Sequence, residues 1–234
     1  MRRPGLRALV RSDLERYLET LRLRTGNRGE DGGRDVQTTR RRRVWIESVL
    51  FKAGFQAALL YRVSHRLFQR GWIHAAWAVG RLNQFLTGAE IEFNAEIGPG
   101  LFIAHPSGIV VGRHTRLGAR TTLFQNVTFG ARSWRPDEIG RMPIAGDDCV
   151  FFANAVVVGG IRIGSECVIA AGAVVERDVP TGALARGVPA EIVQRRGAEI
   201  LGECKVQKSK FVESPGDSQR SSFSQSREAI SLKP

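Results

Sequence analysis

The chain has 234 residues, of which 42% are hydrophobic and 25% charged, and its formal net charge is +12. These values fall in the range of soluble globular proteins. No apolar run approaches the roughly 18 residues of a membrane span, and the N-terminus lacks the apolar core of a signal peptide, so we expect a cytoplasmic protein. The three cysteines have no C-x-x-C spacing, which predicts neither a zinc knot nor a disulfide framework.

The positive charge is concentrated in the first part of the chain. Residues 1–87 hold 18 Lys and Arg against 7 Asp and Glu, and Arg40–Arg43 is the densest basic run. A solvated basic linker is the first interpretation, and a weak contact of the basic helices with an anionic membrane surface or a phosphorylated lipid-linked substrate is the alternative. Nucleic acid is the least favoured partner, because the excess charge lies outside the Gly-rich half.

Apolar residues recur at helical spacing over residues 6–23 and 44–70, which predicts two or three helices. We therefore interpret residues 1–88 as an N-terminal helical region, with a flexible, polar, basic linker near residues 25–43. At the other end, residues 196–234 hold few large apolar side chains and are expected to form a disordered tail.

The middle of the chain changes to a six-residue period. Every sixth residue is apolar in the set Ala145, Phe151, Val157, Ile163, Ile169 and Val175. A second apolar set follows the first by four residues, namely Cys149, Ala155, Ile161, Cys167, Ala173 and Val179. Two stripes at this stride fit neither a helix nor a simple strand alternation and are typical of hexapeptide repeats. The predicted fold class is mainly β, a parallel β-helix of 18-residue triangular coils preceded by N-terminal α-helices.

An earlier block keeps the same stride with two interruptions. The step from Ile103 to Val111 is eight residues, so two extra residues lie in the interval that holds His105. A longer step of sixteen residues predicts an extruded loop over residues 131–143. Residues 89–195 are therefore predicted to form one β-helix domain.

Four stretches carry a resemblance to a known family: "FQAALLYRVSHRLFQRG" before the repeats, "HPSGIVVG", "QNVTFG" and the closing "IAAGAVVERDVPTGALARGVPAEIV". Together they resemble the serine O-acetyltransferase-like branch of the left-handed hexapeptide-repeat acyltransferases, over roughly residues 45–195. The resemblance implies a left-handed β-helix that moves an acetyl group from acetyl-CoA to a hydroxyl without a metal. It also implies a homotrimer, because the family seats CoA between neighbouring subunits.

The resemblance implies that His105 is the general base and that Glu90 orients it. The spacing agrees, because fifteen residues is close to one coil and places Glu90 near the same corner. A carboxylate there could accept the proton of one imidazole nitrogen and leave the other nitrogen free as the base. The alternatives are that His105 is only an exposed corner residue or that His114 is the base, although His114 is expected to point outward.

The resemblance also places the cofactor. Backbone groups at Ala153 and Ala171 are expected to hold the pantetheine arm, and Arg177 is expected to meet a phosphate of CoA. Arg195 or Arg196 could assist. The alternative for each arginine is a solvated surface charge.

Two departures from the family pattern concern the acceptor. The family places an aspartate directly before the catalytic histidine and a second histidine after a loop arginine; here these positions hold Ala104 and Met142, and Met142 follows Arg141. We expect these three residues to line the acceptor pocket, which Ala104 and Met142 make less polar than one built for serine. An acetyl-CoA-dependent O-acetyltransferase acting on a small-molecule or carbohydrate hydroxyl is the main interpretation, and a serine O-acetyltransferase of cysteine biosynthesis is the alternative.

Two further classes are the alternatives to an acetyltransferase. A noncatalytic scaffold would use the β-helix for assembly and the basic helices for a partner. A γ-carbonic anhydrase needs three histidines for zinc, and only His105 and His114 lie in the repeats, so this class is disfavoured.

Overall fold

The computed structural model describes residues 4–25, 52–133, 135 and 140–194. The expected tail, residues 196–234, lies outside the described residues, as do Arg195 and nearly all of the expected linker.

Three helices precede the strands: α1 (Leu6–Thr25), α3 (Ala53–Gln69) and α4 (Ile73–Thr87). α4 ends at Gly88, whose φ of 75° lies in the left-handed region that glycine adopts without strain, and the Gly88 N–H donates to the Gln84 carbonyl at 2.9 Å. This sharp end turns the chain directly into the first strand. None of the helices in the described ranges has both the length and the apolarity that crossing a bilayer requires.

The repeat region consists of short strands, most of them two residues long. In chain order they are β1 (Glu90–Ile91), β2 (Glu96–Ile97), β3 (Phe102–Ile103), β4 (Val110–Val111), β5 (Arg116–Leu117), β6 (Thr122–Leu123), β7 (Thr128–Gly130), β8 (Ile144–Ala145), β9 (Val150–Phe151), β10 (Val156–Val158), β11 (Arg162–Ile163), β12 (Val168–Ile169), β13 (Val174–Val175), β14 (Ala183–Arg186) and β15 (Glu191–Gln194).

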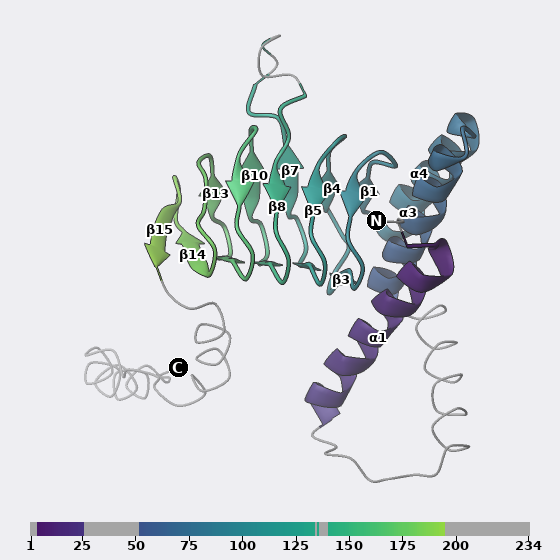
Figure 1. The fold of residues 1–234 in the computed structure, drawn as a ribbon, viewed down its shortest axis with the longest axis horizontal. Coiled ribbons are helices and arrows are strands. Elements are labelled where there is room, and N and C mark those ends of the chain that lie inside the picture. Colours follow the sequence, from purple (N-terminus) through teal and green to yellow (C-terminus); the bar gives the residue numbers. More distant parts are fainter. Residues whose placement is uncertain (1–3, 26–51, 134, 136–139, 195–234) are drawn as a thin grey trace, which may run out of the picture. The chain divides into compact units, whose positions relative to one another are not determined.

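Along most of the stack, each strand pairs with the strand three places later in the chain. This pairing produces three sheets (Figure 1). Their orders are β1-β4-β7-β10-β13, β11-β8-β5-β2 and β15-β14-β12-β9-β6-β3. Figure 1 shows α3 and α4 beside the first coils, where α4 contacts β1 and α3 contacts β3. The predicted order of helices followed by a parallel β-helix is therefore confirmed.

The predicted stride of eighteen residues sets the register. Ala145 pairs with Ile163 one coil later, and Phe151 pairs with Ile169 in the same way. The inward side chains of both stripes are buried and form one continuous core. Between β7 and β8 the stride is interrupted at the position of the predicted loop, residues 131–143.

The glycines that follow inward residues are required by the close approach of neighbouring coils. A Cβ on Gly98 would come within 2.6 Å of the Ala119 nitrogen in the next coil, and one on Gly146 within 2.7 Å of the Ser165 nitrogen. Neither of these two glycines has a positive φ. Positive φ instead occurs elsewhere in the turns, often at residues with side chains, namely His114, Arg120, Asn126, Asp148, Asn154 and Glu166.

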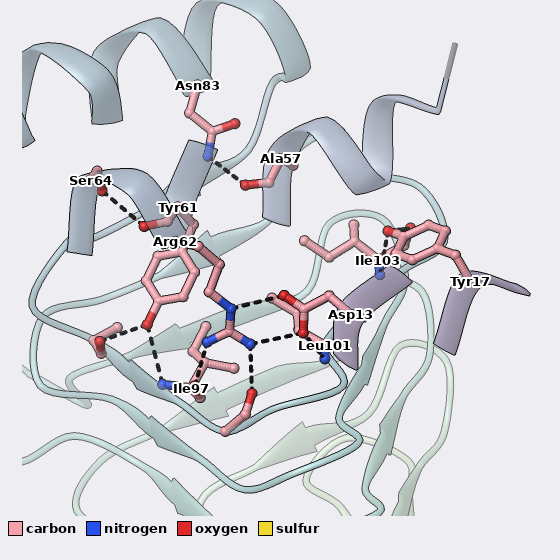
Figure 2. Close-up of polar contacts among 12 residues, drawn as sticks. Asp13, Tyr17, Ala57, Tyr61, Arg62, Ser64, Asn83, Ile97, Leu101 and Ile103 are labelled. Carbon is pink, nitrogen blue, oxygen red and sulfur yellow. Dashed lines mark hydrogen bonds and ion pairs between the residues drawn. The ribbon is translucent and has the colours of Figure 1, made fainter. Parts of the chain in front are cut away.

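A buried ion pair joins α1 to α3 and to the first coil (Figure 2). Arg62 Nε donates to Asp13 Oδ2 at 2.9 Å, and both residues are 1% exposed. The same guanidinium donates to the Ile97 and Gly98 carbonyls at 2.6 Å, while the Leu101 N–H donates to Asp13 at 2.8 Å. The pair therefore satisfies backbone groups at the open edge of the first coil.

Two buried tyrosines complete this edge (Figure 2). The Tyr61 hydroxyl donates to the Ala95 carbonyl at 2.8 Å and accepts from the Ile97 N–H at 3.2 Å. The Tyr17 hydroxyl likewise donates to the Ile103 carbonyl at 2.8 Å and accepts from the Ile103 N–H at 3.0 Å. Each hydroxyl thus replaces the neighbouring strand that the first coil lacks.

Candidate active site

His105 follows β3 in a turn that is longer than the equivalent turns of later coils. The strand side of this turn keeps the normal register, because the Ala104 N–H donates to the Leu123 carbonyl at 2.9 Å. One coil later, the Phe124 N–H donates to the Phe151 carbonyl at 3.1 Å in the same way. Ala104 therefore begins the turn where Phe124 begins the next one.

The far side of the turn also returns to register. The Asn126 N–H donates to the Ser107 carbonyl, as the Asn154 N–H donates to the Gln125 carbonyl, each at 3.0 Å. Ser107 therefore stacks where Gln125 stacks in the next coil, two residues later than a regular repeat would place it. The two extra residues are therefore His105 and Pro106, which form a local bulge.

The bulge presents the imidazole to solvent at one corner of the coil. His105 is exposed, and its ring centroid lies 6.5 Å from that of Phe124. Phe124 stacks on Phe152 of the following coil at 5.0 Å. A row of aromatic side chains thus leads from the histidine along this edge of the stack toward Ala153.

Backbone contacts bring Glu90 next to the same turn. Glu90 lies in β1 opposite Val110 of β4, and its N–H donates to the Ile109 carbonyl at 2.8 Å. The Gly108 N–H donates to the Gly88 carbonyl at 3.0 Å. The segment that carries Glu90 is therefore fixed to the segment that leaves the bulge.

The Glu90 carboxylate is held from α4. Gln84 Nε2 donates to Glu90 Oε2 at 2.9 Å, and the Glu90 side chain is half-buried. Among the hydrogen bonds of the described residues, none joins Glu90 to His105. Gln84 was not predicted, because its only signal in the sequence is a position in the last helical turn before Gly88.

A groove of about 100 Å³ opens beside this carboxylate, between α4 and the first coils. Trp77, Arg81 and Gln84 line its helical side, and Glu90 and Arg113 line its other side. The groove therefore places charged side chains, Arg81 and Arg113, as well as the Trp77 ring, around Glu90.

The residues expected to hold CoA follow the same edge of the stack. Ala153 is half-buried, and its carbonyl accepts from the Gly172 N–H at 2.9 Å, so this carbonyl already has a partner in the next coil. Ala171 is exposed one coil further along. Arg177 is exposed but donates from Nη2 to the Ala190 carbonyl at 2.8 Å, which gives it a structural contact as well.

The residues expected near the acceptor are divided between the bulge and the loop. Ala104 is half-buried beside His105. Met142 is half-buried, and its methyl group lies so close to Gly112 that a Cβ there would overlap it. Arg141 is exposed, with its Cβ 3.0 Å from the position of a Cβ on Gly160.

The alternative base, His114, is an exposed corner residue with a φ of 63°. Within the described residues, no group of three or more His, Cys, Asp or Glu side chains is arranged to hold a metal ion.

Comparisons with known proteins agree on one family. Residues 144–177 match the family model for the hexapeptide repeat of succinyl-transferase. A serine acetyltransferase of Helicobacter pylori is 38% identical over 149 residues, covering 64% of this chain and 86% of the relative.

Solved structures show the same relationship. Serine acetyltransferase of Neisseria gonorrhoeae in complex with serine is 30% identical with a TM-score of 0.64, covering 80% of this chain and 68% of that one. A serine acetyltransferase in complex with CoA is 26% identical with a TM-score of 0.64, covering 81% and 70%. The left-handed β-helix predicted from the sequence is confirmed by these neighbours.

Proposed function

The chain belongs to the serine acetyltransferase family of hexapeptide-repeat acyltransferases, and on this premise we propose that it transfers an acetyl group from acetyl-CoA to a hydroxyl, with serine as the first acceptor to test. One observation carries the proposal to particular residues. His105 is one of the two extra residues in its turn and is exposed at a corner whose flanking backbone is fixed by hydrogen bonds on both sides.

In this proposal His105 acts as the general base. Its unprotonated ring nitrogen takes the hydroxyl proton while the hydroxyl oxygen attacks the thioester carbonyl carbon of acetyl-CoA. The tetrahedral intermediate then collapses, the carbon–sulfur bond breaks, and the imidazolium returns the proton to the CoA thiolate. Proton transfer of this kind typically contributes about 10²- to 10⁴-fold to the rate.

Glu90 is the proposed orienting group for His105. A carboxylate that accepts from one ring nitrogen fixes the tautomer and leaves the other nitrogen unprotonated. The support is the backbone pairing that places β1 beside the end of the bulge.

Acetyl-CoA is proposed to bind along the edge that leads from His105 past Ala153 and Ala171, with Arg177 near its phosphates. A solved relative in complex with CoA supports the cosubstrate. We further propose a homotrimer in which a neighbouring subunit completes the CoA site along this edge. Exposed apolar side chains of α4, including Trp77 and Phe85, would then be candidates for burial between subunits.

The acceptor has two candidates. The names of the relatives and the neighbour in complex with serine favour serine over the broader interpretation. Ala104 beside the base and Met142 on the loop favour a carbohydrate hydroxyl as the second candidate, because neither side chain can bind the charged groups of an amino acid.

Thiol release from acetyl-CoA, measured with serine, sugars and nucleotide sugars in parallel, tests both candidates. We expect serine to be turned over and His105→Ala to lower kcat by about 10²-fold or more with little change in CoA affinity. His114→Ala is the matched control and should retain activity. Full activity in His105→Ala would overturn the mechanism, and turnover of a sugar but not serine would overturn the choice of acceptor.

A further inference from the structure

We propose that Gln84 of α4 is a positioning residue that acts through Glu90, and that Arg81 fixes the orientation of its amide. This inference rests on the proposed function, since it concerns the residue that orients the base. It assigns to the helical region a direct part in arranging the catalytic corner.

The residues concerned lie on one face of α4. Trp77, Arg81 and Gln84 are separated by four and three residues, the spacing that brings helical side chains into contact. The Arg81 guanidinium lies over the Trp77 ring, 4.9 Å from its centroid, and Arg81 Nη1 donates to Gln84 Oε1 at 2.7 Å. The Arg81 guanidinium is therefore held by the Trp77 ring and by the Gln84 amide oxygen.

The chemistry of the three groups fixes the direction of the hydrogen bonds. A guanidinium can only donate, so the carbonyl oxygen of the Gln84 amide must face Arg81. The amide nitrogen then faces Glu90 and donates to Oε2 at 2.9 Å. An ionised carboxylate has a second oxygen, which stays available to a ring N–H of His105.

Arg81, Gln84 and Glu90 form a relay of side chains, and the backbone keeps this relay close to the bulge. The Gln84 carbonyl accepts from the N–H of Gly88, where α4 ends, and the Gly88 carbonyl accepts from the Gly108 N–H. A Cβ on Gly88 would approach the Ser107 Cα to 3.4 Å, which shows how closely the helix end packs against the turn. Two successive backbone hydrogen bonds thus connect Gln84 to the segment that follows His105.

The first test replaces Gln84 by methionine, which has a similar length but no N–H donor. We expect Gln84→Met to lower kcat by about fivefold to thirtyfold while the KM for acetyl-CoA stays unchanged, because the lost hydrogen bond orients the base and does not bind the cosubstrate. Gln69→Met is the matched control. Gln69 also bonds a side chain on its own helix, His65 at 2.8 Å, and its substitution should leave kcat unchanged.

The second test separates positioning from a general structural effect. If Gln84 acts through Glu90, then Gln84→Met should cause no further loss of kcat in a Glu90→Gln background. A purely structural role would lower kcat by the same factor in both backgrounds. Additive losses would therefore overturn the inference, as would wild-type kcat in Gln84→Met.

His105→Ala distinguishes the two proposals. Loss of activity in His105→Ala with full activity in Gln84→Met would refute only the positioning role. Full activity in His105→Ala would refute the proposed function, and the positioning role with it. Urea unfolding of every variant at one protein concentration checks that each retains its fold.

Discussion

The two ends of the β-helix solve the same problem in different ways. A stack of parallel coils leaves unpaired N–H and C=O groups at its first and last turns. At the first turn, side chains of Asp13, Tyr17, Tyr61 and Arg62 satisfy them (Figure 2). At the last turn, β15 pairs antiparallel with β14 through backbone hydrogen bonds.

The difference predicts how each end responds to substitution. A side-chain cap concentrates its hydrogen bonds in a few buried polar atoms, so loss of one atom leaves buried groups without partners. A backbone cap distributes its contacts over four residue pairs, from Ala183 with Gln194 to Arg186 with Glu191, and these contacts do not depend on side-chain identity. The first coil should therefore be sensitive to single substitutions, and the last coil tolerant of them.

The largest effect is expected at the buried ion pair. Asp13→Ala removes the partner of an arginine that is 1% exposed and should lower the free energy of unfolding by about 3–5 kcal/mol. Urea unfolding at neutral pH measures the change. Arg11→Ala is the control on the same helix, because its ion pair with Glu15 is exposed and should contribute about 0–1 kcal/mol. Equal losses in the two variants would show that the cap contributes no special stability.

An intermediate effect is expected at high pH. Burial raises the pKa of both Tyr17 and Tyr61, the only tyrosines in the sequence, above the ordinary value of 10.0. The unfolded chain therefore loses phenol protons that the folded chain retains, so this stability is complete below pH 10 and is lost as the pH rises. Between pH 10 and the raised pKa of the folded state, each tyrosine should make the free energy of unfolding fall by about 1.4 kcal/mol per pH unit.

Urea unfolding between pH 8 and pH 11 measures this slope. Tyr17→Phe combined with Tyr61→Phe should be less stable at neutral pH but should flatten the dependence above pH 10. An unchanged slope in the double variant would contradict a role for these two phenols in the alkaline loss of stability.

The smallest effect is expected at the last coil. Arg177→Ala removes a hydrogen bond to the Ala190 carbonyl, but the arginine is exposed and water can replace it. We expect a loss of about 0.5 kcal/mol or less in the free energy of unfolding, measured by the same urea titration. A loss as large as that of Asp13→Ala would remove the distinction between the two ends.

The repeat core was predictable because its signal is local in the sequence. Inward residues such as Phe151 and Ile169 recur at a fixed stride, and the eight-residue step from Ile103 to Val111 revealed the interval of the bulge. Only the register of the neighbouring coil shows that His105 is itself one of the extra residues.

The cap and the relay could not be predicted, since they depend on contacts between distant segments. Asp13 and Tyr17 lie in a helix whose periodicity indicates only that one face is buried. The contact of Gln84 with Glu90 requires that α4 end at Gly88 and that the chain reverse there. Such contacts arise from tertiary packing, which a single-sequence pattern does not encode.

The long span between α1 and its partners has a consequence for the order of folding during synthesis. Asp13 receives the Leu101 N–H from 88 residues later, whereas Ala145 pairs with Ile163 only one coil away. Closing the longer loop costs more chain entropy. α1 is the first of the described helices to leave the ribosome, yet its hydrogen bonds to Leu101 and Ile103 cannot form until the first coil has been translated, so the nascent chain carries this helix without its cap contacts until then.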